Sequence, residues 1–132
     1  MPDDLAWFTE ETARLRTMRG QTVPTLLFFH IPLKCYAEAV ERDAYTGLAL
    51  EAVSCWGDEA GLGAGILKRA GGVRACFCGH NHRCDFHFEE DGILFSYGRI
   101  TGHGGYGHDI ARGAKLIQLN PLGDHLEAET VF

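Results

Sequence analysis

The spacing of hydrophobic positions predicts helices and strands in alternation over the first half of the chain. Apolar side chains recur at helical spacing over Asp3–Met18 and Gly20 follows, so we predict an amphipathic helix that ends at this glycine. Val23–Phe29 is a short apolar run rich in strand-forming residues, which is typical of a buried strand flanked on both faces by helices. The mixed stretch Lys34–Ala52 predicts a partly helical segment with a break at Gly47.

The second half predicts one weak helix and then mainly strands. Asp58 or Glu59 is expected to open a helix over Ala60–Ala70, which three glycines weaken. A strand is expected over Val73–Cys78, and a hairpin is expected from Phe86–Phe88 and Ile93–Tyr97 around the turn Glu89–Gly92. A glycine-rich loop follows over Gly98–Gly113. Two final strands are expected over Ala114–Leu119 and Leu126–Phe132, joined by the turn Asn120–Asp124. This order indicates one α/β domain over residues 1–132 with a mixed sheet, antiparallel at one side.

Composition and charge narrow the classes of protein that fit this pattern. The chain has 132 residues and a formal net charge of −6, an acidic balance that argues against a nucleic-acid-binding surface. No apolar run approaches the roughly 18 residues of a membrane-spanning helix, so we expect no membrane segment. Five cysteines form an odd number, which argues against a disulfide scaffold. The first residues lack the layout of a signal peptide, so the protein is expected to be intracellular if Met1 is its true start; its localisation is otherwise open.

Histidines follow two of the expected strands. His30 comes directly after Val23–Phe29, and Gly79-His80-Asn81-His82 comes directly after Val73–Cys78. Open α/β folds place their sites at the carboxyl ends of strands, so we expect the two segments to converge. Imidazole is the commonest metal ligand near neutral pH, and the rings of His80 and His82 can reach a common centre from an extended turn. The alternatives are a surface turn with two polar rings and, for His30, a satisfied core histidine; Asn81 needs no role beyond the turn.

Two further groups of residues have both a functional and a plain interpretation. A cysteine or a histidine stands at every second position over residues 76–84, which suggests a zinc site. Ligands along one straight strand, however, lie too far apart to coordinate one zinc ion tetrahedrally. We therefore expect Cys76 and Cys78 to be small buried strand residues. In the glycine-rich loop, Arg99 can hold a phosphate as a bidentate fork, and His103 and Tyr106 can approach a substrate. The alternative is a mobile surface loop with solvated rings.

Several segments together resemble the calcineurin-like metallophosphoesterases, most closely their purple-acid-phosphatase-like branch. The segments that carry the resemblance are Leu26–Leu33, Gly72–His82 and Tyr97–Arg99, with Ala6–Phe8 and Gly104–Gly107 in support. Lys115 stands where the family more often has arginine. The resemblance covers nearly all of this chain but only the carboxyl-terminal half of the family's domain, so it implies half of an αββα sandwich with antiparallel hairpins toward the carboxyl terminus.

The resemblance also implies a chemistry. Family members hold two metal ions, iron, zinc or manganese, about 3.5–4 Å apart and use a metal-activated water to attack a phosphate ester. It implies that His30 and His80 bind one metal and that His82 binds the other. The family's remaining ligands come from an Asp-x-His, a Gly-Asp and a Gly-Asn-His that precede these histidines. We interpret Asp85-Phe86-His87, Gly57-Asp58 and Gly123-Asp124 as coincidences, because their order along the chain is wrong.

The sequence therefore predicts an incomplete half of a metal-dependent phosphoesterase, with no catalytic residue of its own and at most one weakly held metal. Its expected partners are a phosphate ester substrate and the missing amino-terminal half, which either a longer gene product or a second chain would supply. A half-domain is expected to expose apolar surface beside Val23–Phe29 and Val73–Cys78. The alternative from a different class is a non-catalytic zinc- or partner-binding module derived from the same fold.

Overall fold

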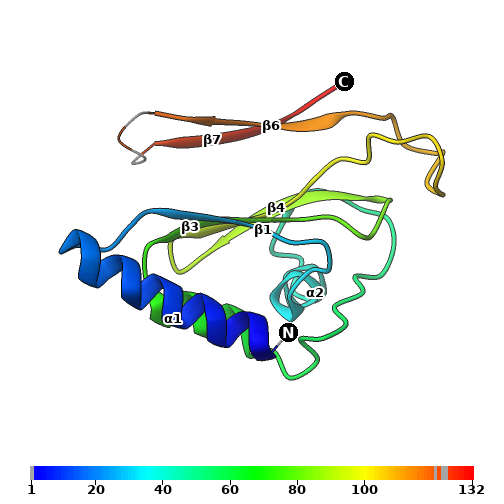
Figure 1. Ribbon diagram of the computed structural model, residues 1–132. Coiled ribbons are helices and arrows are strands. Elements are labelled where there is room, and N and C mark those ends of the chain that lie inside the picture. Colours follow the sequence, from blue (N-terminus) through cyan, green and yellow to red (C-terminus); the bar gives the residue numbers. More distant parts are fainter. Residues whose placement is uncertain (1, 121, 123–124) are drawn as a thin grey trace.

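Three layers make up the part of the chain that the structure, a computed structural model, describes, namely residues 2–120, 122 and 125–132 (Figure 1). In chain order the elements are α1 (Pro2–Arg19), β1 (Thr25–Phe28), α2 (Lys34–Glu41), β2 (Thr46–Ala49), α3 (Gly63–Ala70), β3 (Val73–Cys78), β4 (Cys84–Glu90), β5 (Ile93–Tyr97), β6 (Ala114–Leu119) and β7 (Leu126–Val131). Helices cover one face of a central sheet, and the hairpin β6–β7 covers the other face. This arrangement confirms the predicted α/β class with a mixed sheet.

The central sheet has the strand order β1-β3-β5-β4-β2. Strands β1, β3 and β5 run parallel, and β4 is antiparallel to both of its neighbours. The predicted hairpin of β4 and β5 is confirmed, with a turn at Asp91 and Gly92, whose φ angles of 51° and 76° suit a tight two-residue connection. The second sheet is the predicted antiparallel pair β6–β7; the expected turn Asn120–Asp124 lies partly outside the described residues.

A buried tyrosine occupies the centre of the core. Tyr36 of α2 is fully buried, and its hydroxyl donates a 2.9 Å hydrogen bond to the carbonyl oxygen of Cys76 on β3. Its ring meets four other rings nearly edge-on, those of Phe86, Phe88, Phe95 and Tyr97. Edge-to-face contacts of this kind stabilise aromatic pairs beyond the area they bury. Tyr36 therefore joins the helical layer to three strands of the sheet.

The helix α3 begins later than predicted, and one carboxylate caps both α2 and α3. The helix begins at Gly63, three residues after the expected start at Ala60. The buried Asp58 accepts hydrogen bonds from the backbone N–H of Lys34 at 3.0 Å and from that of Gly63 at 2.9 Å. Both amides stand at the first position of a helix, where no carbonyl of the same helix can accept from them, so Asp58 caps α2 and α3 together.

The predicted helix break at Gly47 lies inside a strand instead. Residues 34–41 are helical as expected, but Gly47 lies within β2, opposite Phe86 of β4. Its φ of 120° is one that glycine adopts without strain, and a Cβ there would overlap the carbonyl oxygen of Asp85. Glycine at this position thus permits close strand pairing.

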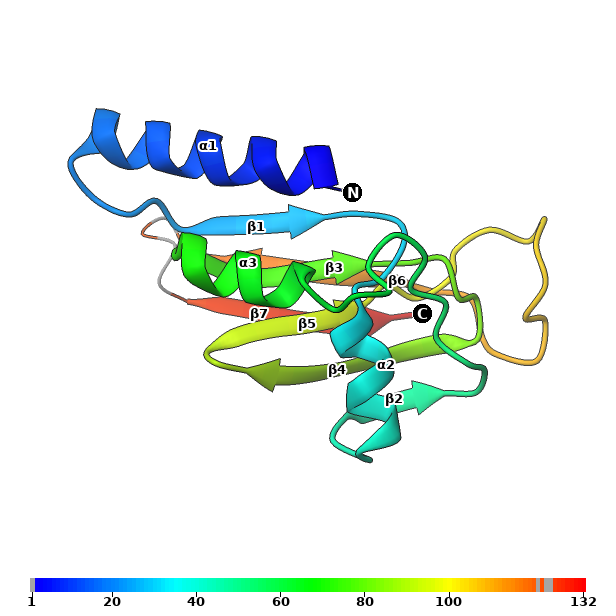
Figure 2. The same cartoon turned by 90° about the horizontal axis from the view of Figure 1, so that it is seen from below.

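The first strand is an edge strand, so the expectation that it is buried on both faces is wrong. Phe28 of β1 is 65% exposed, and the nearby Trp7 of α1 is 64% exposed. Figure 2 shows α1 running alongside β1 at the margin of the sheet. Exposed apolar side chains therefore gather beside β1, as predicted, whereas β3 lies inside the sheet and is mostly buried. Over the described residues, no helix is long and apolar enough to cross a bilayer.

Candidate functional site at the strand ends

The carboxyl ends of β1 and β3 are joined by backbone hydrogen bonds beyond the strands themselves. The Phe29 amide donates to the Phe77 carbonyl oxygen at 3.0 Å, and the Gly79 amide donates to the His30 carbonyl oxygen at 3.0 Å. Parallel pairing continues past both strands and brings together two segments that are far apart in sequence. The loop over residues 98–113 projects beyond the same edge of the sheet (Figure 2). The predicted convergence of the two histidine segments is confirmed.

His30 and His80 face each other at this edge. The distance from His30 Nε2 to His80 Nδ1 is 3.3 Å, and the two rings lie edge to face with centroids 5.2 Å apart. His80 has a φ of 74°, a left-handed conformation that is uncommon for residues other than glycine and recurs at functional sites. The indole of Trp56 lies beside His80, with ring centroids 5.9 Å apart.

The spacing of the two ring nitrogens fits a single metal ion. Two imidazole nitrogens, each about 2.0–2.1 Å from a tetrahedral zinc, stand about 3.3 Å from one another. The His30–His80 separation equals this value at 3.3 Å. Among the described residues, however, no group of three or more histidine, cysteine or acidic side chains is placed to hold a metal. The pair alone offers two ring nitrogens, and the same 3.3 Å separation also suits a hydrogen bond between the two rings.

His82 points to the glycine-rich loop. Its ring stacks on that of Tyr106 with centroids 4.2 Å apart, and its Nδ1 lies 3.2 Å from the Tyr106 carbonyl oxygen. His80 and His82 nevertheless line one cavity of about 340 Å³, together with Gly98, Arg99 and Gly105. The His82 ring therefore has surroundings that differ from those of the His30–His80 pair.

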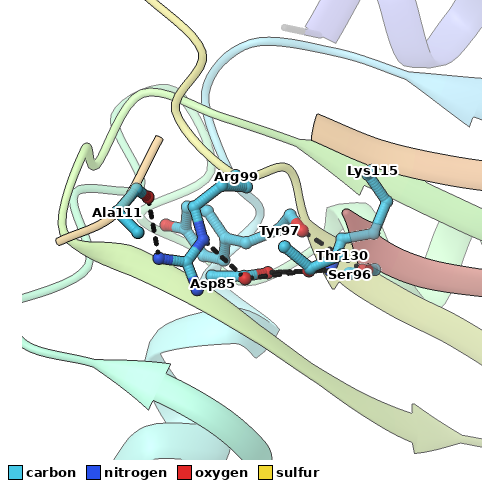
Figure 3. Close-up of polar contacts among 7 residues, drawn as sticks. All are labelled: Asp85, Ser96, Tyr97, Arg99, Ala111, Lys115 and Thr130. Carbon is cyan, nitrogen blue, oxygen red and sulfur yellow. Dashed lines mark hydrogen bonds and ion pairs between the residues drawn. The ribbon is translucent and has the colours of Figure 1, made fainter. Parts of the chain in front are cut away.

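The predicted substrate residues have different surroundings. Arg99 lines the cavity, but its Nε donates to Asp85 at 2.8 Å and its Nη1 donates to the Ala111 carbonyl oxygen at 3.2 Å (Figure 3). His103 is exposed in the loop. Tyr106 contacts His82 and donates its hydroxyl to Glu51. The loop is thus attached to the histidine turn through Tyr106.

A buried carboxylate behind the site holds Arg99. Asp85 of β4 accepts hydrogen bonds from Arg99, from Lys115 Nζ of β6 at 2.7 Å and from the Thr130 hydroxyl of β7 at 2.9 Å (Figure 3). Burial acts to raise the pKa of Asp85, but the hydrogen bonds from Lys115 and Thr130 and the neighbouring positive charges outweigh it, so the pKa lies below its usual range. Asp85 thus links the hairpin to the central sheet through Lys115 and Thr130.

Asn81 has a structural role that the sequence analysis missed. Its buried side-chain oxygen accepts hydrogen bonds from the Ser54 amide at 3.1 Å and from the Tyr97 hydroxyl at 2.9 Å. Its side-chain nitrogen donates to the Ala52 carbonyl oxygen at 3.0 Å. Asn81 therefore fixes the segment around residue 53 against the histidine turn, and an asparagine between two polar rings gave no sequence signal of these partners.

Four of the five cysteines are buried thiols, and Cys55 is half-buried. Cys76 and Cys78 are nearly inaccessible, as predicted, and burial raises the pKa of Cys76 to about 12. Burial also raises the pKa of Cys84, to about 11. Metals bind the thiolate form, so these values disfavour the alternative in which cysteines of β3 and β4 ligate zinc.

Comparisons with known proteins give three relatives, all from Arabidopsis thaliana. The chain is 31% identical over 113 residues to a protein named probable inactive purple acid phosphatase 14, 30% identical over 108 residues to number 29, and 34% identical over 96 residues to number 28. The matches cover 85%, 76% and 72% of this chain but only 28%, 28% and 24% of the relatives. No protein-family model and no solved structure matches the chain. The relatives support a purple-acid-phosphatase-like relationship at family level.

Proposed function

We propose that this chain carries the histidine side of a metallophosphoesterase-like centre, binds one divalent metal ion through His30 and His80, and does not hydrolyse phosphate esters by itself. The observation that carries the proposal is the 3.3 Å between His30 Nε2 and His80 Nδ1, which suits two ligands of one tetrahedral ion. The family-level relationship supports phosphate esters as the class of ligand. Zinc, iron and manganese are the candidate ions.

The residues of this chain hold and orient the ligands. The hydrogen bond from Gly79 to the His30 carbonyl oxygen fixes the two histidine segments against each other, and Trp56 flanks the His80 ring. An ion bound there would supply Lewis-acid chemistry toward a phosphoryl oxygen or a water molecule. Arg99 and Lys115 share one carboxylate, Asp85, so this group keeps one surplus positive charge behind the cavity, which favours an anionic ligand.

The absence of hydrolysis is proposed from the chemistry of the ligand set. Neutral imidazoles supply no negative charge to offset two divalent ions held about 3.5–4 Å apart. The chain contains no Gly-Asn-His, and the carboxylate of its single Asp-x-His, that of Asp85, is bonded to Arg99 and Lys115. The word inactive in the names of the three relatives also supports this proposal.

Metal titration tests the proposal directly. We expect calorimetry with Zn²⁺ to give about one weakly held ion per chain and His30→Ala or His80→Ala to weaken binding at least about tenfold. His125→Ala is the matched control, because this exposed histidine lies near β7 and contacts Glu127. An unchanged affinity in both ligand variants would overturn the metal proposal. Two tightly held ions, with turnover of an aryl phosphate that His80→Ala abolishes, would overturn the proposed lack of hydrolysis.

A second candidate function is that this chain completes its centre with carboxylates from another polypeptide segment. The exposed Phe28 favours it, because among the described residues β1 pairs on one side only, and such an edge strand can accept another strand. The test is co-expression with the region of a relative that precedes the matched segment. Co-purification and phosphatase activity would support this candidate, and loss of both with Phe28→Lys would locate the contact. Failure to co-purify would leave the non-catalytic metal-binding module.

A further inference from the structure

We propose that Tyr106 is a positioning residue that fixes the tautomer and the orientation of the His82 imidazole. The proposal goes beyond the proposed function, in which His30 and His80 hold the metal, and concerns the separate ring of His82, which lines the cavity. The glycine-rich loop then has a defined task, which is to present one particular nitrogen of His82.

The partner of His82 Nδ1 determines where its proton sits. The atom 3.2 Å from Nδ1 is the backbone carbonyl oxygen of Tyr106, which can only accept a hydrogen bond. Nδ1 therefore carries the hydrogen, and in the neutral ring the lone pair is on Nε2. Metal-ligating histidines are commonly fixed in this way, by donating the other ring N–H to a carbonyl or carboxylate.

Tyr106 is itself anchored on the turn that carries His82. Its hydroxyl donates to the Glu51 carboxylate at 2.9 Å and accepts from the His82 amide at 3.2 Å. Glu51 also accepts a 2.7 Å hydrogen bond from the Arg83 amide. The same carboxylate thus binds both the loop and the histidine turn, and the stacked rings of Tyr106 and His82 lie between these polar contacts.

The glycines beside Tyr106 are required by the His82 ring. A Cβ on Gly105 would stand 2.5 Å from His82 Cε1, too close for the ring to stay where it is. Gly107 has a φ of 83°, and a Cβ there would stand 3.2 Å from His82 Cβ. A Cβ on Gly104, by contrast, would have nothing within 4 Å. Residues 105–107 therefore fit closely around His82, whereas the neighbouring Gly104 does not.

Histidine ring NMR on the full, metal-free chain provides the test. Long-range ¹H–¹⁵N correlations at a pH above the ordinary imidazole pKa of about 6.5 distinguish the two tautomers. We expect His82, assigned by comparison with His82→Gln, to show the pattern of a proton on Nδ1. Gly105→Ala and Tyr106→Ala should lose this pattern and give a mixture of tautomers, and Tyr106→Phe and Glu51→Gln should weaken it. Gly104→Ala is the matched control and should keep the wild-type pattern.

The outcomes separate this proposal from the metal proposal. A wild-type His82 that carries its proton on Nε2, or that keeps the Nδ1 pattern in Tyr106→Ala, would overturn the positioning role whatever the chain does with metal. Failure of Zn²⁺ to bind His30 and His80 would leave the tautomer result unchanged and would count only against the proposed function. Backbone amide spectra of each variant show that the fold is retained, so that a loss of the pattern is not a loss of structure.

Discussion

Replacement of Asp85 by asparagine tests how the hairpin β6–β7 is held on the central sheet. The side chains of Asp85, Arg99 and Lys115 are 5%, 6% and 9% exposed, so the charge of Asp85 is the partner of two nearly buried cations. Asp85→Asn keeps the shape of the side chain and removes its charge. We expect β6 and β7 to lose protection from hydrogen exchange first, because Lys115 and Thr130 belong to these strands.

The size of the effect follows from the burial of the cations. Removal of one partner of a buried ion pair costs about 3–5 kcal/mol, because a charge is left without compensation in a poorly solvated place. A domain of this size is stable by about 5–15 kcal/mol, so a fifth or more of the free energy of unfolding is at stake. With an m-value of about 2 kcal/mol per molar urea, the midpoint should fall by about 1.5–2.5 M.

The dependence on pH has a definite sign. Because the pKa of Asp85 is lower in the folded chain than in the unfolded chain, the carboxylate stabilises the fold fully above the unfolded value of about 3.9. This contribution is lost as the pH falls through the lower folded pKa. The difference in stability between the wild type and Asp85→Asn should therefore be constant from pH 5 upward and shrink toward zero in strong acid.

Urea unfolding followed by tryptophan fluorescence and circular dichroism measures these quantities. Asp109→Asn is the matched control, since the Arg83–Asp109 ion pair has a similar separation of 2.7 Å but side chains that are 37% and 51% exposed. Solvent screens such a pair, and the control should unfold close to the wild type. If Asp85→Asn shifted the midpoint no more than Asp109→Asn, the buried ion pairs would not hold the hairpin and the reasoning would be refuted.

Three further outcomes are expected. In native protein at pH 8 a thiol reagent should modify Cys55 alone quickly, because burial raises the pKa values of the other four thiols; fast reaction of a second cysteine would contradict this. Gly47→Ala should destabilise the chain by about 1–3 kcal/mol in thermal unfolding, because the new Cβ meets a carbonyl oxygen at a positive φ, whereas Gly104→Ala should be neutral. Asn81→Ala should lower the free energy of unfolding by about 1–3 kcal/mol, since buried partners lose their hydrogen bonds; an unchanged urea midpoint would contradict it.

The sequence by itself determined most of the elements and the meeting of two histidines. Two strand-forming runs, one ending directly before His30 and the other one glycine before His80, were enough to predict that these histidines lie together, because parallel strands end at the same side of a sheet. Two strand-forming segments on either side of a turn with Asp91 and Gly92 also sufficed for the hairpin of β4 and β5. The elements and the hairpin depend on neighbours in the chain, so the local pattern predicts them, whereas the meeting of the histidines was predicted from the general position of sites in open α/β folds.

The tertiary structure alone decided the contacts between layers. The apolar run of β1 predicted a buried strand, but β1 is the edge strand of the central sheet and is therefore partly exposed. Asp85 contacts Lys115 and Thr130, which are 30 and 45 residues away in the sequence, because the hairpin packs over the sheet. Tyr106 contacts Glu51, which is 55 residues away in the sequence, because the glycine-rich loop folds back toward it. Hydrophobic periodicity indicates which face of an element is buried, but it carries no information about which distant side chain covers that face.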